Sequence, residues 1–301
     1  MRIVVALGGN ALLERGEKPD AAPQLRHIEA AAHALAPVAE SNDLIICHGN
    51  GPQVGLLALE SENDRSLTHP YPLDVLGAQT QGMIGYWLSL CLRNAGVTRP
   101  VVSVLTQTLV GRTDPAFAHP TKFVGPVYDR AEASRLAGVH RWDIAADGNR
   151  WRRVVASPAP IDILELHSII DLVQAQTLVV CGGGGGVPVV DDGTGRLRGV
   201  DAVIDKDLTA ALLATAVHAD RLLLLTDVRA VMQNFGAPDA QPISLISSGE
   251  LRTMQFPAGS MGPKIDACLQ FTAATGHAAA IGALTEVAAI LAGTAGTTIS
   301  A

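Results

Sequence analysis

Lysine is rare in this chain, and the places where it occurs are the first indication of chemistry. The 301 residues contain four lysines against eighteen arginines. Three of the four lie in short motifs bounded by glycine, proline or aspartate: Lys122 in Pro-Thr-Lys, Lys206 in Ile-Asp-Lys-Asp, and Lys264 in Met-Gly-Pro-Lys. A lysine ammonium is a compact, rotatable point charge, whereas arginine presents a rigid planar fork. These motifs therefore predict positions where a flexible cation meets an anionic ligand.

Turns rich in glycine or polar residues follow four short apolar runs. One such turn is most often only a tight connection, but several together, with three lysines, favour a phosphate site. In open parallel sheets ligands bind outside the carboxyl ends of the strands. Glycine lets the backbone approach a ligand, and N–H groups at helix starts bind phosphate oxygens. The turns are Gly8-Gly9-Asn10, His48-Gly49-Asn50-Gly51, the run Gly182–Gly186, and Thr226-Asp227.

Several kinds of phosphate and hydrolase chemistry are excluded by their missing motifs. The chain has no G-x-x-x-x-G-K-[ST] loop, no serine nucleophile elbow and no His-Glu metal helix. The glycine run does not complete G-x-G-x-x-G, because Val187 and Pro188 follow it. What remains is phosphoryl transfer by positioning, in which cationic side chains neutralise charge on the moving group.

Strand-like and helical patterns alternate along the chain and would position these turns. β-branched runs occur between longer stretches with helical periodicity, which predicts a three-layer α/β/α fold around an open, mainly parallel sheet. The expected strands are Ile3–Leu7, Leu44–Cys47, Val101–Leu105, Leu178–Cys181, Leu222–Leu225 and Ala278–Ile281. The expected helices are Gln24–Glu40, Leu76–Ala95, Ile161–Gln174, Leu208–Val217 and Lys264–Thr275.

One segment interrupts this alternation. From about Gly111 to Pro160 the chain is rich in Pro, Arg, Asp and Trp, and the apolar period is lost. Such a stretch is typical of an inserted subdomain. We therefore expect a single domain over residues 1–301, with residues 111–160 forming a protruding lid that makes few contacts with the core.

Composition excludes several classes of protein. The net charge of −7 and the lack of a basic run argue against a nucleic-acid partner, and no apolar stretch has the length of a membrane span. The chain begins directly in a strand-like run, so no signal peptide is expected and the cytoplasm is the expected compartment. The cysteines are widely spaced without a C-x-x-C pair, which favours buried thiols over a disulfide or a metal site. They are Cys47, Cys91, Cys181 and Cys268.

Together these motifs resemble those of the carbamate kinases, a branch of the amino acid kinase family. The matching stretches run in order over essentially the whole chain, and those at Trp151 and Pro160 are specific to this branch. They are Val5–Leu12, His48–Gly55, Gln81–Tyr86, Asp114–Phe117, Pro120–Lys122, Trp151–Val155, Ser157–Pro158, Pro160–Ile163, Val203–Asp207, Thr226–Val228, Gly259–Lys264 and Gly296–Ile299.

The resemblance implies an amino acid kinase fold and an ATP-dependent phosphotransferase. Its reaction would be reversible phosphoryl transfer between carbamoyl phosphate and ADP, giving ATP and carbamate, which breaks down to ammonia and CO2. The resemblance also implies Mg²⁺ carried by the nucleotide phosphates, no metal site on the protein, and a homodimer.

The resemblance also assigns roles to individual residues. Lys206 and Lys264 would hold the transferring phosphoryl group and the nucleotide phosphates. Asp207 would orient these two lysines, and Lys122 would reach the carbamoyl phosphate from the inserted segment. Substrate oxygens would contact Gly8, Gly9, Asn10, Gly49, Asn50 and Gly51. The nucleotide side would include Thr226, Asp227, Phe235, Met261 and Gly262. Departures from the family pattern at Arg229 and Met232 lie on that side.

Simpler interpretations stand beside these roles. Each lysine could form only a surface salt bridge, and Asp207 could be a helix N-cap. His48 is interpreted as a structural hydrogen bonder, because carbamate is already anionic and needs no base.

Two rival functions remain. A related kinase acting on a larger substrate, such as an N-acyl amino acid or a nucleoside monophosphate, would need an extended pocket. A catalytically idle family member with a binding or regulatory role would be expected to lack one of the phosphate-site lysines, and none is missing.

Overall fold

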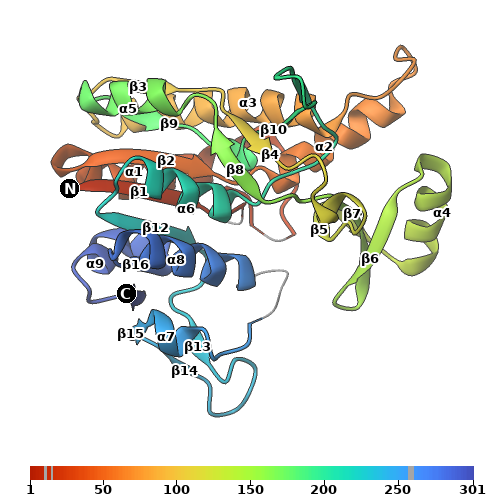
Figure 1. The fold of residues 1–301 in the computed structure, drawn as a ribbon. Coiled ribbons are helices and arrows are strands. Elements are labelled where there is room, and N and C mark those ends of the chain that lie inside the picture. Colours follow the sequence, from red (N-terminus) through yellow and green to blue (C-terminus); the bar gives the residue numbers. More distant parts are fainter. Residues whose placement is uncertain (10–11, 15, 257–260) are drawn as a thin grey trace.

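An eight-stranded sheet forms the centre of the molecule (Figure 1). The computed structural model describes residues 1–9, 12–14, 16–256 and 261–301. Neighbouring strands are parallel except for the β16–β17 pair, and the order is β15-β17-β16-β12-β1-β2-β9-β3. The bounds are β1 Arg2–Leu7, β2 Asp43–His48, β3 Val101–Ser103, β9 Leu178–Val180, β12 Arg221–Thr226, β15 Leu245–Ser247, β16 Ala279–Ala283 and β17 Thr297–Ser300.

Helices cover both faces of this sheet, and two apolar cores lie between the layers. Along β1, Ile3 and Val5 face one core while Val4 and Ala6 face the other, as the two-residue period of a strand requires. The first core includes residues of α1 (Ala21–Ser41), α3 (Leu73–Asn94) and α9 (Val287–Leu291). The second includes residues of α5 (Leu166–Gln174), α6 (Lys206–Ala216) and α8 (Gly262–Thr275). The predicted three-layer architecture is therefore confirmed.

All six predicted strands are present, whereas one predicted helix is partly wrong. Pro160–Ile163 forms strand β8, and helix α5 begins only at Leu166. β8 pairs antiparallel with β4 (Gln107–Val110). Pro160 cannot donate a ladder hydrogen bond, and Ile161 and Ile163 are β-branched, so the local preference is for strand rather than helix.

Several elements were not predicted. Helix α2 (Gly51–Asn63) follows the second glycine turn directly. β4 and β8 belong to a second sheet, in the order β11-β10-β4-β8, with β10 at Val187–Asp191 and β11 at Leu197–Gly199. Smaller elements are β13 (Met232–Gln233), β14 (Gln241–Pro242) and α7 (Ser248–Leu251).

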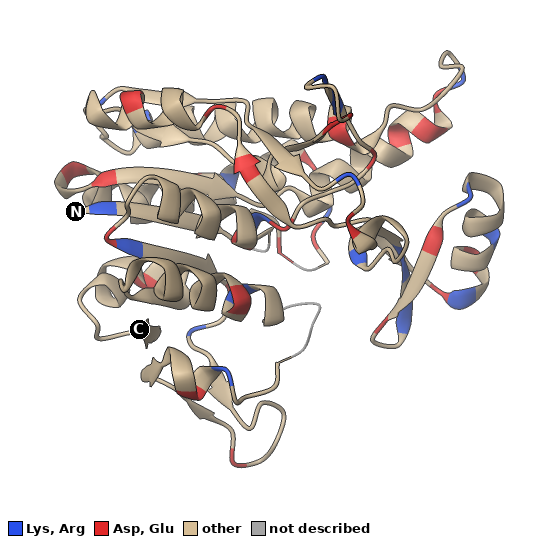
Figure 2. Ribbon diagram, viewed as in Figure 1, with Lys and Arg blue, Asp and Glu red and all other residues tan. Residues whose placement is uncertain are grey.

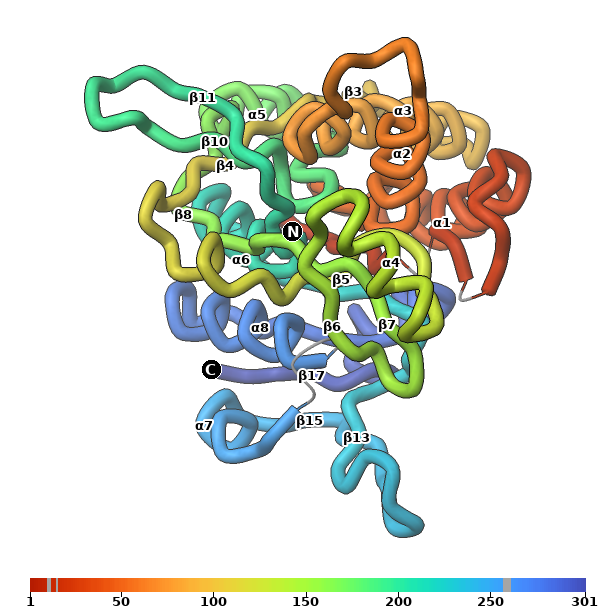
Figure 3. The backbone as a smooth tube through the Cα atoms, turned by 90° about the vertical axis from the view of Figure 1, so that its right-hand side faces the viewer, coloured from red at the N-terminus to blue at the C-terminus, as the bar shows by residue number. Residues whose placement is uncertain are grey.

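The segment between β4 and β8 projects from the body of the molecule (Figures 1 and 3). It contains a short turn of helix at Pro115–Phe117, a three-stranded sheet and one helix. These are β5 (Lys122–Tyr128), α4 (Arg130–His140), β6 (Asp143–Asp147) and β7 (Arg150–Val155). Positively and negatively charged residues both occur on this segment and on the body (Figure 2).

The base of the projecting segment is packed more closely than its composition suggested. Val124 and Val155 share an apolar cluster with Val54 of α2 and residues of α3. A Cβ added to Gly55 of α2 would lie 2.3 Å from the Cα of Gly125 in β5. The expectation of few core contacts is therefore wrong for the base, because paired glycines let α2 and β5 meet backbone to backbone.

Among the described residues, none of the helices has the length and apolar character needed to cross a lipid bilayer.

Candidate phosphate site

Helix α6 begins beside the carboxyl end of the central sheet and brings two acidic side chains and a lysine into a buried position. Asp205 is the N-cap, and its Oδ1 accepts a hydrogen bond from the backbone N–H of Asp207 at 2.9 Å. Asp205, Lys206 and Asp207 are all buried. The interpretation of Asp207 as the N-cap is therefore wrong, because Asp205 fills that position and leaves the Asp207 carboxylate available for other partners.

Asp207 bridges two lysines from different helices. Its Oδ1 accepts a hydrogen bond from Lys206 Nζ, and its Oδ2 accepts one from Lys264 Nζ at 2.9 Å. Lys264 lies on α8, which packs against α6. The side chains of both lysines are largely buried. The interpretation of Lys206 and Lys264 as surface salt bridges is therefore wrong: these are buried cations held side by side by one carboxylate.

The charges in this cluster shift one another's pKa values. Burial raises the pKa of Asp207, but the two ammonium groups outweigh it and hold that pKa well below its usual range. Burial lowers the pKa of Lys206, with Asp207 opposing and Lys264 reinforcing the shift. Burial also lowers the pKa of Lys264, but Asp207 outweighs it and the net shift is upward. Asp207 is thus held in its anionic form, and its lowered pKa makes it a weak proton acceptor.

Lys122 reaches the same place from the projecting segment. Its Nζ donates a hydrogen bond to Asp205 Oδ2, and its side chain remains about one-third exposed, at 36%. Asp205 therefore joins the start of α6 to the start of β5. The three ammonium groups meet the carboxylates of Asp205 and Asp207, and the charge of Asp227 also acts on Lys264.

The glycine turns after β1 and β2 pack against each other and against the end of β12. Gly8 N donates to Leu225 O at 2.8 Å, and Gly49 N donates to Leu7 O at 2.9 Å. A Cβ added to Gly49 would lie 2.9 Å from the backbone N of Gly9. The two turns can touch because Gly49 lacks a side chain. Asn10 was predicted as a substrate contact and lies outside the described residues.

Asn50 and Gly51 form the start of helix α2. Asn50 is the N-cap residue, and its side-chain Nδ2 donates to Thr80 Oγ1 at 2.9 Å. The Asn50 side chain is therefore held by α3, and Gly51 is the first helical residue. The free N–H groups of a helix start are suited to anions.

The glycine run Gly182–Gly186 forms a wall against these turns. A Cβ at Gly183 would lie 2.3 Å from His48 Nε2, and a Cβ at Gly184 would lie 2.1 Å from Asn50 Nδ2. Gly184 also has a φ of +62°, a conformation that side chains disfavour. Gly185 O accepts hydrogen bonds from Thr108 and Thr209, which ties the wall to α6. The run thus serves close packing behind the site.

His48 is a neutral structural group. Burial lowers its pKa to about 4, and the charge of Lys206 acts in the same direction, while the hydrogen bond to Gly49 O opposes it. The neutral ring donates from Nδ1 to that carbonyl oxygen at 2.9 Å. This agrees with its interpretation as a structural hydrogen bonder.

The predicted nucleotide residues fall into two places. Thr226 Oγ1 donates to Asp227 Oδ1 at 2.9 Å, and the charge of Asp227 contributes to the raised pKa of Lys264. Met261 and Gly262 begin α8 one turn before that lysine. Phe235 is 77% exposed and lines a separate pocket of about 630 Å³ with Met232, Gln233, Asn234, Met254, Gln255 and Phe256.

The donor chemistry of the site does not favour a protein-bound metal. Both oxygens of Asp207 accept hydrogen bonds from lysines, and Asp205 is engaged by Lys122. Within the ranges that the structure describes, no three His, Cys, Asp or Glu side chains gather into a metal-binding group.

Comparison with known proteins identifies the family. The model of the amino acid kinase family matches residues 1–282. The chain belongs to the amino acid kinase family. The carbamate kinase of Rhizobium meliloti (strain 1021) is 49% identical to this chain, and the match covers 100% of this chain and 93% of that protein. The carbamate kinase of Escherichia coli (strain K12) is also 49% identical, with 99% of each chain covered.

A solved structure extends this likeness to three dimensions. The carbamate kinase from Giardia lamblia bound to AMP-PNP superimposes with a TM-score of 0.90 at 38% identity, covering 99% of this chain and 98% of its own. This amino acid kinase therefore has the same fold as a carbamate kinase over its whole length.

The structure of this amino acid kinase brings the three predicted lysines and Asp207 into one cluster, beside the turns of Gly8, Gly9 and Gly49. Asp205 was not predicted, although its place two residues before Asp207 at the start of an apolar helical run is typical of an N-cap. Thr80, Thr108 and Thr209 were also missed, because isolated threonines within helices and strands carry no local signal.

Proposed function

We propose that this amino acid kinase is a carbamate kinase, which transfers a phosphoryl group reversibly between carbamoyl phosphate and ADP to give ATP and carbamate. The observation that carries the proposal is the buried arrangement of Lys206 and Lys264 on the two oxygens of Asp207. The full-length relatives named carbamate kinase support the choice of substrate.

The residues suit a transfer that depends on charge. A terminal oxygen of ADP forms the new bond to phosphorus, and the bond from phosphorus to the carbamoyl oxygen breaks with its electron pair going to carbamate. The charges on the two sides balance, so no proton needs to move. Lys206 and Lys264 stabilise the charge spread over the transferring group, and Asp207 fixes their positions.

The carbamoyl phosphate lies, in this proposal, between the glycine turns and the projecting segment. Backbone N–H groups of Gly9 and Gly51 contact its oxygens, with the side chains of Asn10 and Asn50 as further candidates. The expected contacts from the N–H groups of Gly8 and Gly49 are withdrawn, because these groups donate to Leu225 O and Leu7 O. Lys122 provides a third positive charge from β5. The projecting segment, residues 111–160, acts as a lid. It also excludes water that would hydrolyse the transferring group.

The nucleotide lies on the other side of the lysines. Thr226, Asp227, Met261 and Gly262 flank its phosphates, and the pocket around Phe235 and Met232 receives the base. Mg²⁺ enters with the nucleotide phosphates and neutralises part of their charge.

The proposed oligomer is a homodimer. Helix α3 exposes Tyr86 and Leu90, one turn apart on one face, at 61% and 38%. Val102 is also exposed on β3, the edge strand of the central sheet that packs against α3. Exposed apolar side chains at a sheet edge are suited to burial against a second copy.

The cytoplasm is the proposed compartment, because all four cysteines are free buried thiols and such thiols persist in a reducing environment.

The substrate assignment is tested by comparing phosphoryl donors and acceptors in one assay. ATP formation is measured with ADP and carbamoyl phosphate, and phosphate transfer from ATP is measured with acetylglutamate, aspartate and UMP. We expect rapid turnover with carbamoyl phosphate and none with the three larger acceptors, because the full-length relatives at 49% identity are named carbamate kinases. Faster turnover with any of the larger acceptors would leave only the broader family assignment standing.

A further inference from the structure

Glu62, near the carboxyl end of helix α2, is held by side chains of the projecting segment. Its side chain is only 9% exposed. Glu62 Oε1 accepts a hydrogen bond from Trp142 Nε1 at 3.0 Å and another from Arg153 Nη1 at 3.0 Å. Trp142 precedes β6 and Arg153 lies within β7. One buried carboxylate of the body therefore connects to two elements of the projecting segment.

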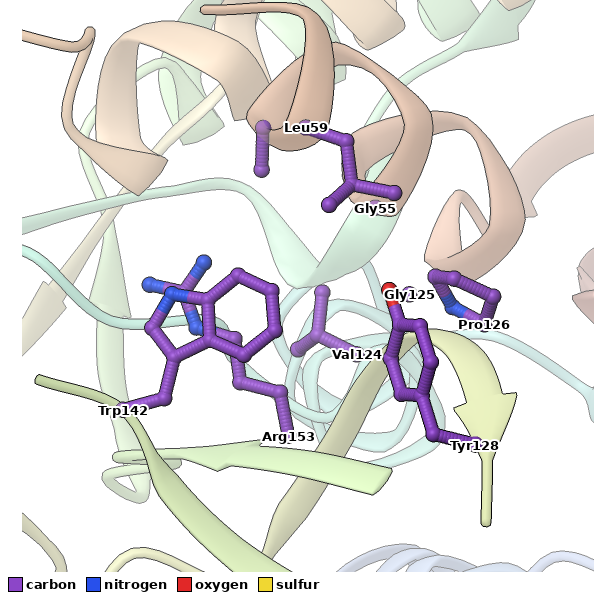
Figure 4. A pocket seen from close by; sticks show the side chains of 9 residues that line it. Gly55, Leu59, Val124, Gly125, Pro126, Tyr128, Trp142 and Arg153 are labelled. Atoms are coloured by element: carbon purple, nitrogen blue, oxygen red, sulfur yellow. The ribbon is translucent and has the colours of Figure 1, made fainter. Parts of the chain in front are cut away.

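The second carboxylate oxygen of Glu62 lies near a third side chain of the projecting segment. Glu62 Oε2 is buried and accepts no hydrogen bond, and His140 Nδ1 at the end of α4 lies 3.7 Å from it. The rings of His140 and Trp142 are stacked, with their centroids 5.0 Å apart. Arg153 Cζ lies 5.0 Å from the centroid of the Trp142 ring. Figure 4 shows Trp142 and Arg153 beside the part of α2 that includes Gly55 and Leu59. Three stacked side chains thus converge on a single anion.

This contact is connected to Lys122 through the small sheet. Arg153 pairs with Val124, and Lys122 pairs with Val155 in the same β5–β7 ladder. At its other end α2 begins at Gly51, in the turn assigned to the substrate. Helix α2 therefore touches the projecting segment through Val54 and Gly55 near its start and through Glu62 near its end. The contact at Glu62 fixes the far end of the helix against β7, which the contacts at its start do not reach.

We propose that Glu62 is a positioning residue, which sets the orientation of the projecting segment and thereby the placement of Lys122 over the substrate turn. This inference rests on the proposed function for its effect on catalysis. A carboxylate suits the task because charge-assisted hydrogen bonds to Arg and Trp are directional, whereas an apolar contact would allow sliding.

Hydrogen exchange tests the orientation directly and needs no activity. Glu62→Ala is compared with Glu60→Ala, a control on the same helix whose side chain is exposed. We expect faster amide exchange in β5, β6 and β7 of the Glu62 variant, with the central sheet unchanged. Exchange in these strands equal to that of the Glu60 variant would overturn the proposal.

Kinetics test whether Glu62 acts through Lys122. We expect Glu62→Ala to raise the KM for carbamoyl phosphate by about ten- to a hundredfold, the effect of misplacing a catalytic group by about 1 Å, while the KM for ADP stays unchanged. Glu62→Gln should restore most of the loss, because its amide oxygen can still accept from Trp142 and Arg153. In a protein that already carries Lys122→Ala, Glu62→Ala should change the KM for carbamoyl phosphate by less than about twofold.

An equal rise in both KM values, or full additivity with Lys122→Ala, would show that Glu62 serves stability alone. If the unmodified protein formed no ATP, the proposed function would fail, while the exchange experiment would still decide whether Glu62 orients the segment.

Discussion

At the scale of single residues, the site is a set of lysines whose positions are fixed by carboxylates. Asp207 uses both oxygens to hold Lys206 and Lys264, and Asp205 uses one oxygen to cap α6 and the other to hold Lys122. Charges that are placed in advance need no reorganisation when negative charge develops in the transition state. This explains why lysine, with its single rotatable ammonium, occupies all three positions.

Replacing either buried lysine should reduce turnover strongly. We expect Lys206→Ala and Lys264→Ala each to lower kcat by roughly a hundred- to a thousandfold, the loss typical of one preorganised donor. Arginine at either position should restore little, because its planar fork does not fit a point-charge site. Lys18→Ala, at an exposed position, is the control. Unchanged rates in both alanine variants with the fold intact would place the transfer site elsewhere.

The buried His48 should make stability depend on pH. Its pKa falls from 6.5 in the unfolded chain to about 4 in the folded protein. Between these values the unfolded chain binds the extra proton, so the free energy of unfolding should fall as the pH drops from about 6.5 to about 4. The loss should reach about 3 kcal/mol at most.

The measurement for His48 is urea unfolding across this pH range in the unmodified protein and in His48→Gln. The contribution of His48 is the difference between the two proteins in how the free energy of unfolding changes with pH, since the other titrating groups are shared. Parallel curves would show that His48 is not held neutral by burial.

At the scale of elements, helix α2 connects the turn that we propose holds the substrate with the projecting segment. It begins at Gly51, meets β5 at Gly55 and holds β7 through Glu62. The contact at Gly55 leaves no room for a side chain, because a Cβ there would meet the backbone of Gly125 at 2.3 Å. Movement of this contact would therefore be transmitted to Lys122 at the start of β5.

Gly55→Ala should displace β5 and impair use of carbamoyl phosphate. We expect a loss of about 1–3 kcal/mol in the free energy of unfolding, as for other overpacked sites. The KM for carbamoyl phosphate should also rise while the KM for ADP stays nearly constant. Gly77→Ala in α3, where a Cβ would meet no atom within 4 Å, is the matched control. A Gly55 variant with normal stability and kinetics would show that the close approach is not required.

At the scale of the whole molecule, the sequence predicts the central sheet well and its surroundings less well. Short apolar runs such as Leu222–Leu225 are buried on both faces of the sheet, as is typical of central parallel strands. Strand β8 was mistaken for the start of a helix because its pairing with β4 spans the whole inserted segment, and short patterns carry no information on distant partners.

The residues of the candidate site also divide into those that the sequence could predict and those that it could not. Lys206, Asp207 and Lys264 lie in distinctive motifs, so their importance could be predicted. Asp205 lies in the same motif as Lys206, but its partner Lys122 is 83 residues away along the chain. Glu62 has ordinary sequence surroundings, and its partner Arg153 is 91 residues away. Such long-range ion pairs become visible only when the fold has placed the two elements together.

The proposed homodimer makes a prediction at this scale as well. The unmodified protein should sediment as a dimer, and Tyr86→Arg combined with Leu90→Arg should sediment as a monomer, because two buried charges on each copy would oppose association. Val127→Arg, at an exposed position on the projecting segment, should leave the dimer intact. A monomer already in the unmodified protein would rule out the dimer.

The central claim is that phosphate passes from carbamoyl phosphate to ADP, and phosphorus NMR follows both molecules at once. With the protein, ADP and Mg²⁺ present, the carbamoyl phosphate signal should decline as the γ-phosphate signal of ATP grows by the same amount, and omitting ADP should reduce the decline to the rate without protein. Loss of carbamoyl phosphate to inorganic phosphate without ATP, or no acceleration by the protein at all, would contradict the account.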